Sequence, residues 1–135
     1  MDNETINFYD RNADKYSKWR SDQGADLTQE IFLQNTKLAG HILDLGCGTG
    51  EKSLWFRNNG LTVKAIDASG KMLEFLKNIS GVVCSQIDIT ELGFEEKFDG
   101  IWASFSVQHL RIKDQDILFT KISKALKSGG IFYLG

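Results

Sequence analysis

A nine-residue run, ILDLGCGTG over residues 42–50, constrains the fold of this chain more than any other feature. A short apolar stretch leads into glycines at three alternate positions, Gly46, Gly48 and Gly50, and a helical stretch follows at about 51–59. Glycine lets a backbone turn sharply and approach a ligand closely, because it has no Cβ and tolerates positive φ. A buried strand, such a loop and a helix, in this order, build a nucleotide-type pocket with backbone amides at the start of the helix.

The spacing after these glycines separates two classes of ligand. A dinucleotide-binding loop has the pattern G-x-G-x-x-G, which would require glycine at the position of Glu51. A carboxylate there would lie beside a pyrophosphate, at a helix end whose dipole favours negatively charged ligands. The pocket therefore suits a cofactor without phosphates, and a nicotinamide-binding domain is the weaker alternative.

Apolar and helical stretches alternate from His41 onward, which predicts an α/β fold. The expected strands are residues 42–45, 61–66, 82–87, 98–103 and 131–134, and the expected helices are 51–59, 71–79 and 114–127. This alternation requires right-handed crossovers and a parallel sheet covered on both faces. A ligand of such a sheet binds beyond the carboxyl ends of the strands, beside the first strand.

The first forty residues are predicted to be helical and to lie at the periphery of the domain. Apolar residues recur at three- and four-residue steps from Ile6 to Tyr16, which places them on one face of a helix. Asp26, with Gln29 three positions later, predicts the capped start of a second helix that ends near Gly40.

The run from Asp44 to Gly50 resembles the first motif of the class I S-adenosylmethionine-dependent methyltransferases. Further segments fall in the order and at the spacing of that family, at 63–67, 86–89, 98–104, 106–110 and 126–134. The opening segment 8–16 also matches, so the resemblance covers nearly all of the 135 residues. It implies a Rossmann-like doubly wound sheet with five parallel strands in the order 3-2-1-4-5 and helices on both faces. One departure is Ser128, where relatives usually carry proline.

The length predicts a single methyltransferase-like domain, with a helical cap over 1–40 and a cofactor-binding core over 41–135. A second departure from the family is that the usual C-terminal antiparallel strand pair is lacking. The apolar strand 131–134 would then be an edge with unpaired backbone groups and neither charge nor proline to protect it. We expect a second copy of the chain, as a homodimer, or a different polypeptide to cover this strand.

The resemblance implies a set of residues that bind S-adenosylmethionine. Asp67 ends a strand about twenty residues after the first loop glycine, where a carboxylate can accept from two ribose hydroxyls. Asp88 would accept from the adenine amino group while the backbone amide of Ile89 donates to the ring, and Ser104 would flank the methyl group. The complete predicted set is Tyr16, Asp44, Gly46, Cys47, Gly48, Gly50, Asp67, Ala68, Met72, Asp88, Ile89 and Ser104.

Several members of this set also have a purely structural interpretation. Asp67 could cap a helix, and Asp88 could be a solvated carboxylate in a loop. Asp44 could satisfy loop amides, although the family resemblance suggests that it also orients the ammonium group of the cofactor. Met72 would pack on the adenine ring, but methionine at helical spacing is more often part of the core. Cys47 is expected to pack in the loop rather than to act as a nucleophile.

The aromatic residues near the N-terminus have two interpretations. They could form a lid over the cofactor, with Tyr16 reaching its carboxylate end. Alternatively, Tyr9, Tyr16 and Trp19 form a stripe that buries the first helix against the rest of the domain.

His109 is the candidate catalytic residue. A histidine with an ordinary pKa of about 6.5 can take the proton released when a hydroxyl or amine is methylated. The alternative is that His109 only shapes the acceptor pocket. Methyl transfer needs no strong base, because a sulfonium is already a good electrophile and alignment can supply most of the acceleration.

Composition excludes several classes of function. The net charge of −2 provides no electrostatic basis for gripping nucleic acid. No apolar run approaches the ~20 residues of a membrane span, and the polar N-terminus is no signal peptide. Cys47 and Cys84 have neither metal-binding nor disulfide spacing, so we expect no metal and a cytoplasmic protein.

Two functions remain at this stage. The first is transfer of a methyl group from S-adenosylmethionine to oxygen or nitrogen of a small-molecule acceptor, by in-line displacement. The alternative is a non-catalytic, cofactor-binding or pairing subunit, or a fragment, without a complete acceptor site.

Overall fold

The computed structural model describes residues 3–21, 26–104 and 107–135, with Tyr9 and residues 14–21 described by their backbone alone. Five parallel strands form one sheet in the order β3-β2-β1-β4-β5, as predicted. The strands are β1 (His41–Leu45), β2 (Thr62–Asp67), β3 (Val82–Gln86), β4 (Phe98–Ala103) and β5 (Leu126–Leu134).

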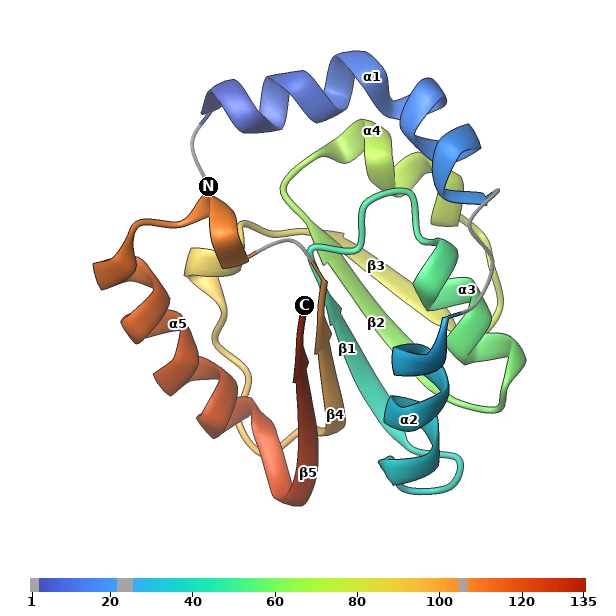
Figure 1. Ribbon diagram of the computed structural model, residues 1–135, viewed down its shortest axis with the longest axis vertical. Helices are drawn as coiled ribbons and strands as arrows, with labels where there is room; N and C mark the ends of the chain where they lie inside the picture. The colour runs from blue at the N-terminus through green and yellow to red at the C-terminus, as the bar shows by residue number, and fades with distance from the viewer. Residues whose placement is uncertain (1–2, 22–25, 105–106) are drawn as a thin grey trace.

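Helices lie on both faces of the sheet, which the doubly wound fold requires (Figure 1). The helices are α1 (Asn3–Ser21), α2 (Leu27–Asn35), α3 (Glu51–Asn58), α4 (Gly70–Leu73) and α5 (Ile112–Ala125). Short 3₁₀ turns, η1 (Glu74–Leu76), η2 (Ile89–Glu91) and η3 (Val107–His109), complete the described elements. In Figure 1, α5 lies on one side of the sheet and α2 and α3 lie on the other.

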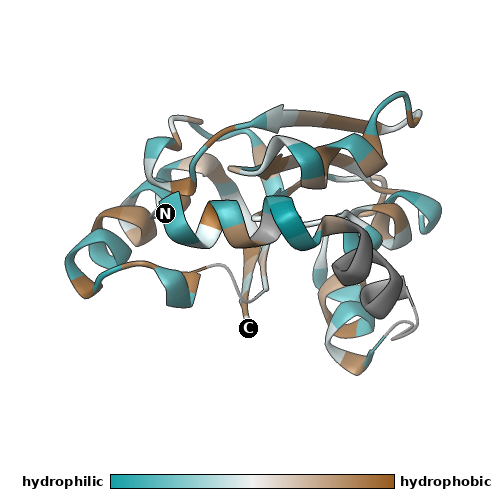
Figure 2. Cartoon of the chain, turned by 90° about the horizontal axis from the view of Figure 1, so that it is seen from above, coloured by the Kyte–Doolittle hydropathy of each residue, from teal (hydrophilic) through white to brown (hydrophobic). Residues whose placement is uncertain are grey.

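The helix α1 lies across the end of the sheet at which the strands finish, which is called the carboxyl edge below, rather than on either face. It contacts α4 and α3, and it runs over the edge at which the strands end (Figure 1). Figure 2 looks onto this edge and shows α1 in front of it, with hydrophilic and hydrophobic residues interspersed along its described part. The helix therefore covers the end of the sheet where ligands of this fold bind.

Alternate residues of the central strands enter two separate cores. Ile42 of β1 packs with α2 and α3, where the rings of Phe32, Phe56 and Trp102 contact one another at 5.1–5.3 Å between centroids. Leu43, the next residue, belongs to the second core, which includes Leu118, Ile122 and Ala125 of α5. Both faces of the central strands are thus buried, as expected for parallel strands, whereas Val83 of the edge strand β3 is 63% exposed.

The prediction of a helix over 71–79 was too long. The α-helix ends at Leu73, the chain continues as the 3₁₀ turn η1 to Leu76, and Lys77 is already extended. Asn78 and Gly81 then adopt positive φ, at 64° and 85°. The reason is geometrical, because the chain must reverse within a few residues to begin β3 directly beside β2.

The other element boundaries differ from the prediction by less. The capping box of Asp26 and Gln29 starts α2 as expected, but this helix ends at Asn35, where Thr36 turns extended, rather than near Gly40. The strand β5 begins at Leu126, opposite Phe98, and its register then shifts so that Ile131 pairs with Gly100. Residues 131–134 pair with β4 as predicted, after this irregular segment.

Candidate cofactor site

The glycine loop after β1 adopts the backbone that its sequence requires. Gly46, Gly48 and Gly50 have φ angles of 74°, 58° and 89°, in the left-handed region that other residues rarely adopt. The backbone amides of Gly46 and Cys47 both donate to the carbonyl oxygen of Ile66 on β2, each at 2.9 Å. These bonds tie the loop to the neighbouring strand and fix its position at the carboxyl edge.

The last glycine of the loop lies against the core. A Cβ on Gly50 would overlap the side chain of Leu76, which is fully buried. Glu51 begins α3 directly after it, and its carboxylate accepts a hydrogen bond from the Thr49 hydroxyl at 2.5 Å. A negative side chain thus lies where a dinucleotide pyrophosphate would approach, which disfavours such a ligand.

Asp67, at the end of β2, bridges the glycine loop and the turn that follows its own strand. One carboxylate oxygen accepts from the backbone amide of Gly48 at 2.8 Å, and the other accepts from the amide of Ser69 at 2.9 Å. Burial raises the pKa of Asp67 above its ordinary value, and these two hydrogen bonds partly offset that effect. A carboxylate has about four acceptor positions, and the backbone amide of Ala68 also interacts with this one, so Asp67 keeps acceptor capacity for at least one further donor.

Asp44 lies deeper than Asp67, beneath the loop. Its side chain is 2% exposed, and its Oδ2 accepts from the hydroxyl of Ser53 on α3 at 2.6 Å. Asp44 pairs in register with Ala65 and Trp102 of the two flanking strands. This position agrees with a supporting role, while contact with a cofactor ammonium stays a prediction.

Asp88 caps the short turn η2 that follows β3. Its Oδ1 accepts from the backbone amide and from the hydroxyl of Thr90, each at 3.0 Å. The carboxylate is therefore held in place by its own loop. Recognition of an adenine amino group by Asp88 stays a prediction.

Four of the predicted cofactor residues are buried side chains of the core. Met72 and Ile89 are each 1% exposed, and Ala68 and Cys47 are each 9% exposed. Burial raises the pKa of the Cys47 thiol, which favours packing over nucleophilic chemistry. Backbone contacts from Ile89 and Ala68 remain compatible with this burial, whereas Met72 would need to expose an edge before an adenine ring could contact it.

The predicted acceptor side lies at the end of β4. Ser104 follows this strand and is half-buried, and His109 ends η3 and is also half-buried. Both follow the carboxyl end of a parallel strand, so they belong to the same edge of the sheet as Asp67. The side chain of Tyr16 lies outside the described residues.

The sequence reasoning missed Asp10. In α1, this residue accepts a hydrogen bond from the hydroxyl of Ser69, in the turn after β2. The two residues are 59 positions apart in the chain. No periodicity links positions so distant, and the only signal was that Asp10 belongs to the opening segment that matches the family.

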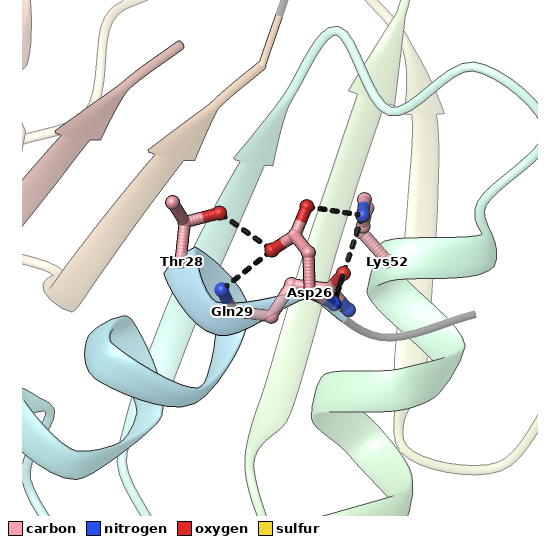
Figure 3. Close-up of polar contacts among 4 residues, drawn as sticks. All are labelled: Asp26, Thr28, Gln29 and Lys52. Carbon is pink, nitrogen blue, oxygen red and sulfur yellow. Dashed lines mark hydrogen bonds and ion pairs between the residues drawn. The ribbon is translucent and has the colours of Figure 1, made fainter. Parts of the chain in front are cut away.

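A second contact fixes α2 against the helix that follows the glycine loop. Figure 3 shows the ammonium of Lys52, from α3, directed at the N-terminal cap of α2. It lies 3.5 Å from Asp26 Oδ2 and also donates to the side-chain oxygen of Gln29. Lys52 is 12% exposed and Gln29 is 1% exposed, so the bond between them is shielded from solvent, whereas the Asp26 side chain is 57% exposed. The contact positions the start of α3.

In the described part of the chain, no three His, Cys, Asp or Glu residues gather in a way that could hold a metal ion. Across the same residues, no helix combines the length and the apolar character needed to cross a membrane.

The fold and the loop define an α/β domain of the nucleoside-binding type. A family model described as a methyltransferase domain matches residues 43–134. The chain therefore belongs to the methyltransferase domain family, and the resemblance to S-adenosylmethionine-dependent methyltransferases is confirmed.

Individual relatives support this assignment. The chain is 29% identical over 120 residues to Methyltransferase GfsG of Streptomyces halstedii, across 82% of this chain and 42% of that protein. It is 32% identical over 105 residues to the carboxy-S-adenosyl-L-methionine synthase of Shewanella woodyi, across 70% of this chain and 43% of that protein. The chain thus spans less than half the length of these curated relatives.

Solved structures share the same architecture. An S-adenosylmethionine-dependent methyltransferase from Mesorhizobium loti superposes with a TM-score of 0.71 at 26% identity, over 79% of this chain and 50% of that chain. An N-methyltransferase from Haemonchus contortus, in complex with phosphomonomethylethanolamine and S-adenosylhomocysteine, superposes with a TM-score of 0.68 at 27% identity. That match covers 79% of this chain and 27% of the other.

Proposed function

We propose that this domain binds S-adenosylmethionine at the carboxyl edge of its sheet and transfers the methyl group to oxygen or nitrogen of a small molecule. The observation that carries the proposal is the pairing of the glycine loop with Asp67. Three glycines in the left-handed region hold a backbone cradle open, and Asp67 lies at its rim with acceptor capacity to spare. A ribose diol needs such an acceptor.

The residues of the site suit a cofactor that is a cation without phosphates. Asp44 and Asp67 end adjacent strands, and Glu51 begins the helix after the loop. Carboxylates attract a sulfonium and an ammonium but repel a pyrophosphate. Asp88 and the backbone of Ile89 would hold the adenine, and Ser104 would leave room for the methyl group.

The chemistry requires little from the protein beyond alignment. S-adenosylmethionine supplies an electrophilic methyl group on a sulfonium. The acceptor oxygen or nitrogen attacks the methyl carbon in line with the sulfur, and the electron pair of the carbon–sulfur bond stays on the sulfur. His109 takes the proton from the acceptor. The helix α1 covers the carboxyl edge of the sheet and would exclude water from the reacting groups, which also favours methyl transfer.

A small acceptor has the better support. The net charge of −2 offers no attraction to nucleic acid, and the Haemonchus contortus relative was solved with a small phosphorylated amine. The family also includes a protein named as a carboxy-S-adenosyl-L-methionine synthase, so membership alone leaves the acceptor open. We place the protein in the cytoplasm.

The alternative, a pairing subunit that binds cofactor without turnover, is favoured by one feature. Among the described strands, β5 pairs with β4 alone, and Leu134 on it is 49% exposed. A second copy of the chain, pairing as a homodimer, or another polypeptide would cover this edge. Light scattering on a chromatographed sample tests both options, since a stable monomer would count against each of them.

Calorimetry with S-adenosylhomocysteine and with NAD, in parallel, tests the ligand. Binding of the first and not of the second supports the proposal. A folded protein that binds neither contradicts it.

An assay for S-adenosylhomocysteine release with small alcohols and amines then tests turnover. His109→Ala should lower turnover far more than cofactor affinity, because the residue acts on the acceptor side. Equal turnover in the variant would reduce His109 to packing, and cofactor binding without release against any acceptor would favour the pairing subunit.

A further inference from the structure

A chain of hydrogen bonds connects the helix over the site to the glycine loop. The hydroxyl of Ser69 donates to the Asp10 carboxylate of α1, and the backbone amide of Ser69 donates to Asp67 at 2.9 Å. The other oxygen of Asp67 accepts from the amide of Gly48 at 2.8 Å. Ser69 therefore stands between α1 and the carboxylate at the rim of the site.

The Ser69 hydroxyl both donates and accepts a hydrogen bond. Its oxygen accepts from the backbone amide of Met72 at 3.3 Å, as the N-terminal cap of α4, and the residue is 1% exposed. Its single hydrogen is donated to Asp10, because an ionised carboxylate can only accept and the Met72 amide can only donate. A residue that caps α4, holds Asp67 and binds α1 couples the positions of all three.

The contact between Asp10 and Ser69 forms in spite of an unfavourable interaction between two negative charges. Asp10 brings a second negative group near Asp67, and its charge contributes to the raised pKa of Asp67, after burial. The position of the Asp10 carboxylate near Asp67 is therefore unfavourable by itself. The hydrogen bond from Ser69 to a charged acceptor, worth more than a neutral one, offsets this repulsion.

The contact is also open to water from one side. A hollow of about 520 Å³ lies between α4 and β3, and Asp10 lines it together with Lys71, Lys77 and Gln86. Water can therefore compete for the Asp10 carboxylate. A hydrogen bond at the border of such a hollow can break and form again, unlike one inside the core.

From these contacts we infer that Asp10 is a positioning residue for the cofactor site. It fastens α1 across the carboxyl edge through Ser69, and through the same serine it holds the turn that presents Asp67. Release of a ligand from beneath α1 then requires the bond between Asp10 and Ser69 to break. This inference rests on the proposed function, because it takes the edge beneath α1 as the cofactor site.

The test uses three variants of the whole protein. Asp10→Ala removes the acceptor, Asp10→Asn removes the charge but keeps an oxygen that can accept from Ser69, and Glu4→Gln is the matched control. Glu4 lies in the same helix and is exposed, so its substitution removes one negative charge without touching the contact. Two quantities are measured: hydrogen exchange of individual amides, and the dissociation rate of S-adenosylhomocysteine.

In Asp10→Ala, exchange should accelerate about tenfold along α1 and also at the amides of Ser69 and Gly48, as expected for one lost charge-assisted bond. The dissociation rate should rise by a similar factor, while Asp10→Asn and Glu4→Gln stay within about threefold of the unmodified protein. Rescue by asparagine separates the positioning role from simple loss of helix stability.

The opposite results are equally clear. Faster exchange confined to α1, with Ser69, Gly48 and the dissociation rate unchanged, would overturn the inference. An effect of Glu4→Gln as large as that of Asp10→Ala would overturn it as well. If the unmodified protein binds no S-adenosylhomocysteine, the proposed function fails, and the exchange rates at Ser69 and Gly48 alone decide whether Asp10 holds the turn.

Discussion

The ends of β1 and β2 carry the same residue type, and the structure uses the two differently. Asp44 lies under the loop at 2% exposure and is bonded to a side chain, the hydroxyl of Ser53. Asp67 lies at the rim at 9% exposure and is bonded to two backbone amides. The first arrangement supports the loop from below, whereas the second places a carboxylate at the carboxyl end of its strand. Under the proposed function, the two neighbouring aspartates separate support from recognition.

A substitution that disturbs the loop supported by Asp44 should give the largest effect, and this effect should be on unfolding free energy. Gly50→Ala forces a side chain into the left-handed region and against the buried Leu76, so unfolding free energy should fall by about 3 kcal/mol. Urea denaturation measures this change. Gly60→Ala is the matched control, because Gly60 has a φ of 96° but no atoms within 4 Å of the added Cβ. Equal losses in the two variants would mean that contact with Leu76 contributes nothing.

The recognition side should appear in binding. Asp67→Ala should weaken S-adenosylhomocysteine binding by about 2 kcal/mol, or roughly thirtyfold, because two hydrogen bonds to a charged acceptor are lost. Titration calorimetry gives the affinity. An unchanged affinity would show that the ribose assignment of Asp67 is wrong.

Asp44→Ala should lower the stability of the fold rather than the affinity for the cofactor. It leaves the Ser53 hydroxyl buried without its acceptor, which should lower unfolding free energy by about 1.5 kcal/mol. The double variant Asp44→Ala/Ser53→Ala should lose less than the sum of the two single variants. A loss of cofactor affinity as large as that of Asp67→Ala would end the distinction between the two aspartates and place Asp44 on the ligand.

The smallest effect should be a dependence on pH. Burial raises the pKa of Asp67, so between 3.8 and that raised value the folded protein binds more protons than the unfolded chain. The contribution of Asp67 to unfolding free energy therefore falls as the pH rises through this window. Asp67→Ala should remove that part of the slope in urea denaturation as the pH rises above the ordinary aspartate value of about 4. An identical slope in the variant would contradict the raised pKa.

Much of the fold followed from periodicity and spacing. The five strands and the capped start of α2 at Asp26 were predicted because burial alternation and capping chemistry are local, whereas the strand order was predicted from the family resemblance. The length of α4 was not. Its end at Leu73 depends on where β3 must start, and that is a property of the sheet rather than of the residues in the helix.

The site divides in the same way. The glycines of the loop were predicted from their own conformational freedom, and Asp67 from its distance along the chain. The contact of Asp10 with Ser69 and that of Lys52 with Asp26 were not, because each joins two elements that only packing brings together.

The amino-acid sequence by itself determined the loop, the acids that flank it and the alternation that builds a parallel sheet, since these depend on residues close in the chain. Tertiary structure alone decided how deeply each aspartate is buried and which groups it accepts hydrogen bonds from. It also decided that α1 crosses the carboxyl edge, where Asp10 meets Ser69. The physical reason is that burial and hydrogen-bond partners depend on neighbours in space, and the chain fixes these neighbours only after the sheet and its helices have packed.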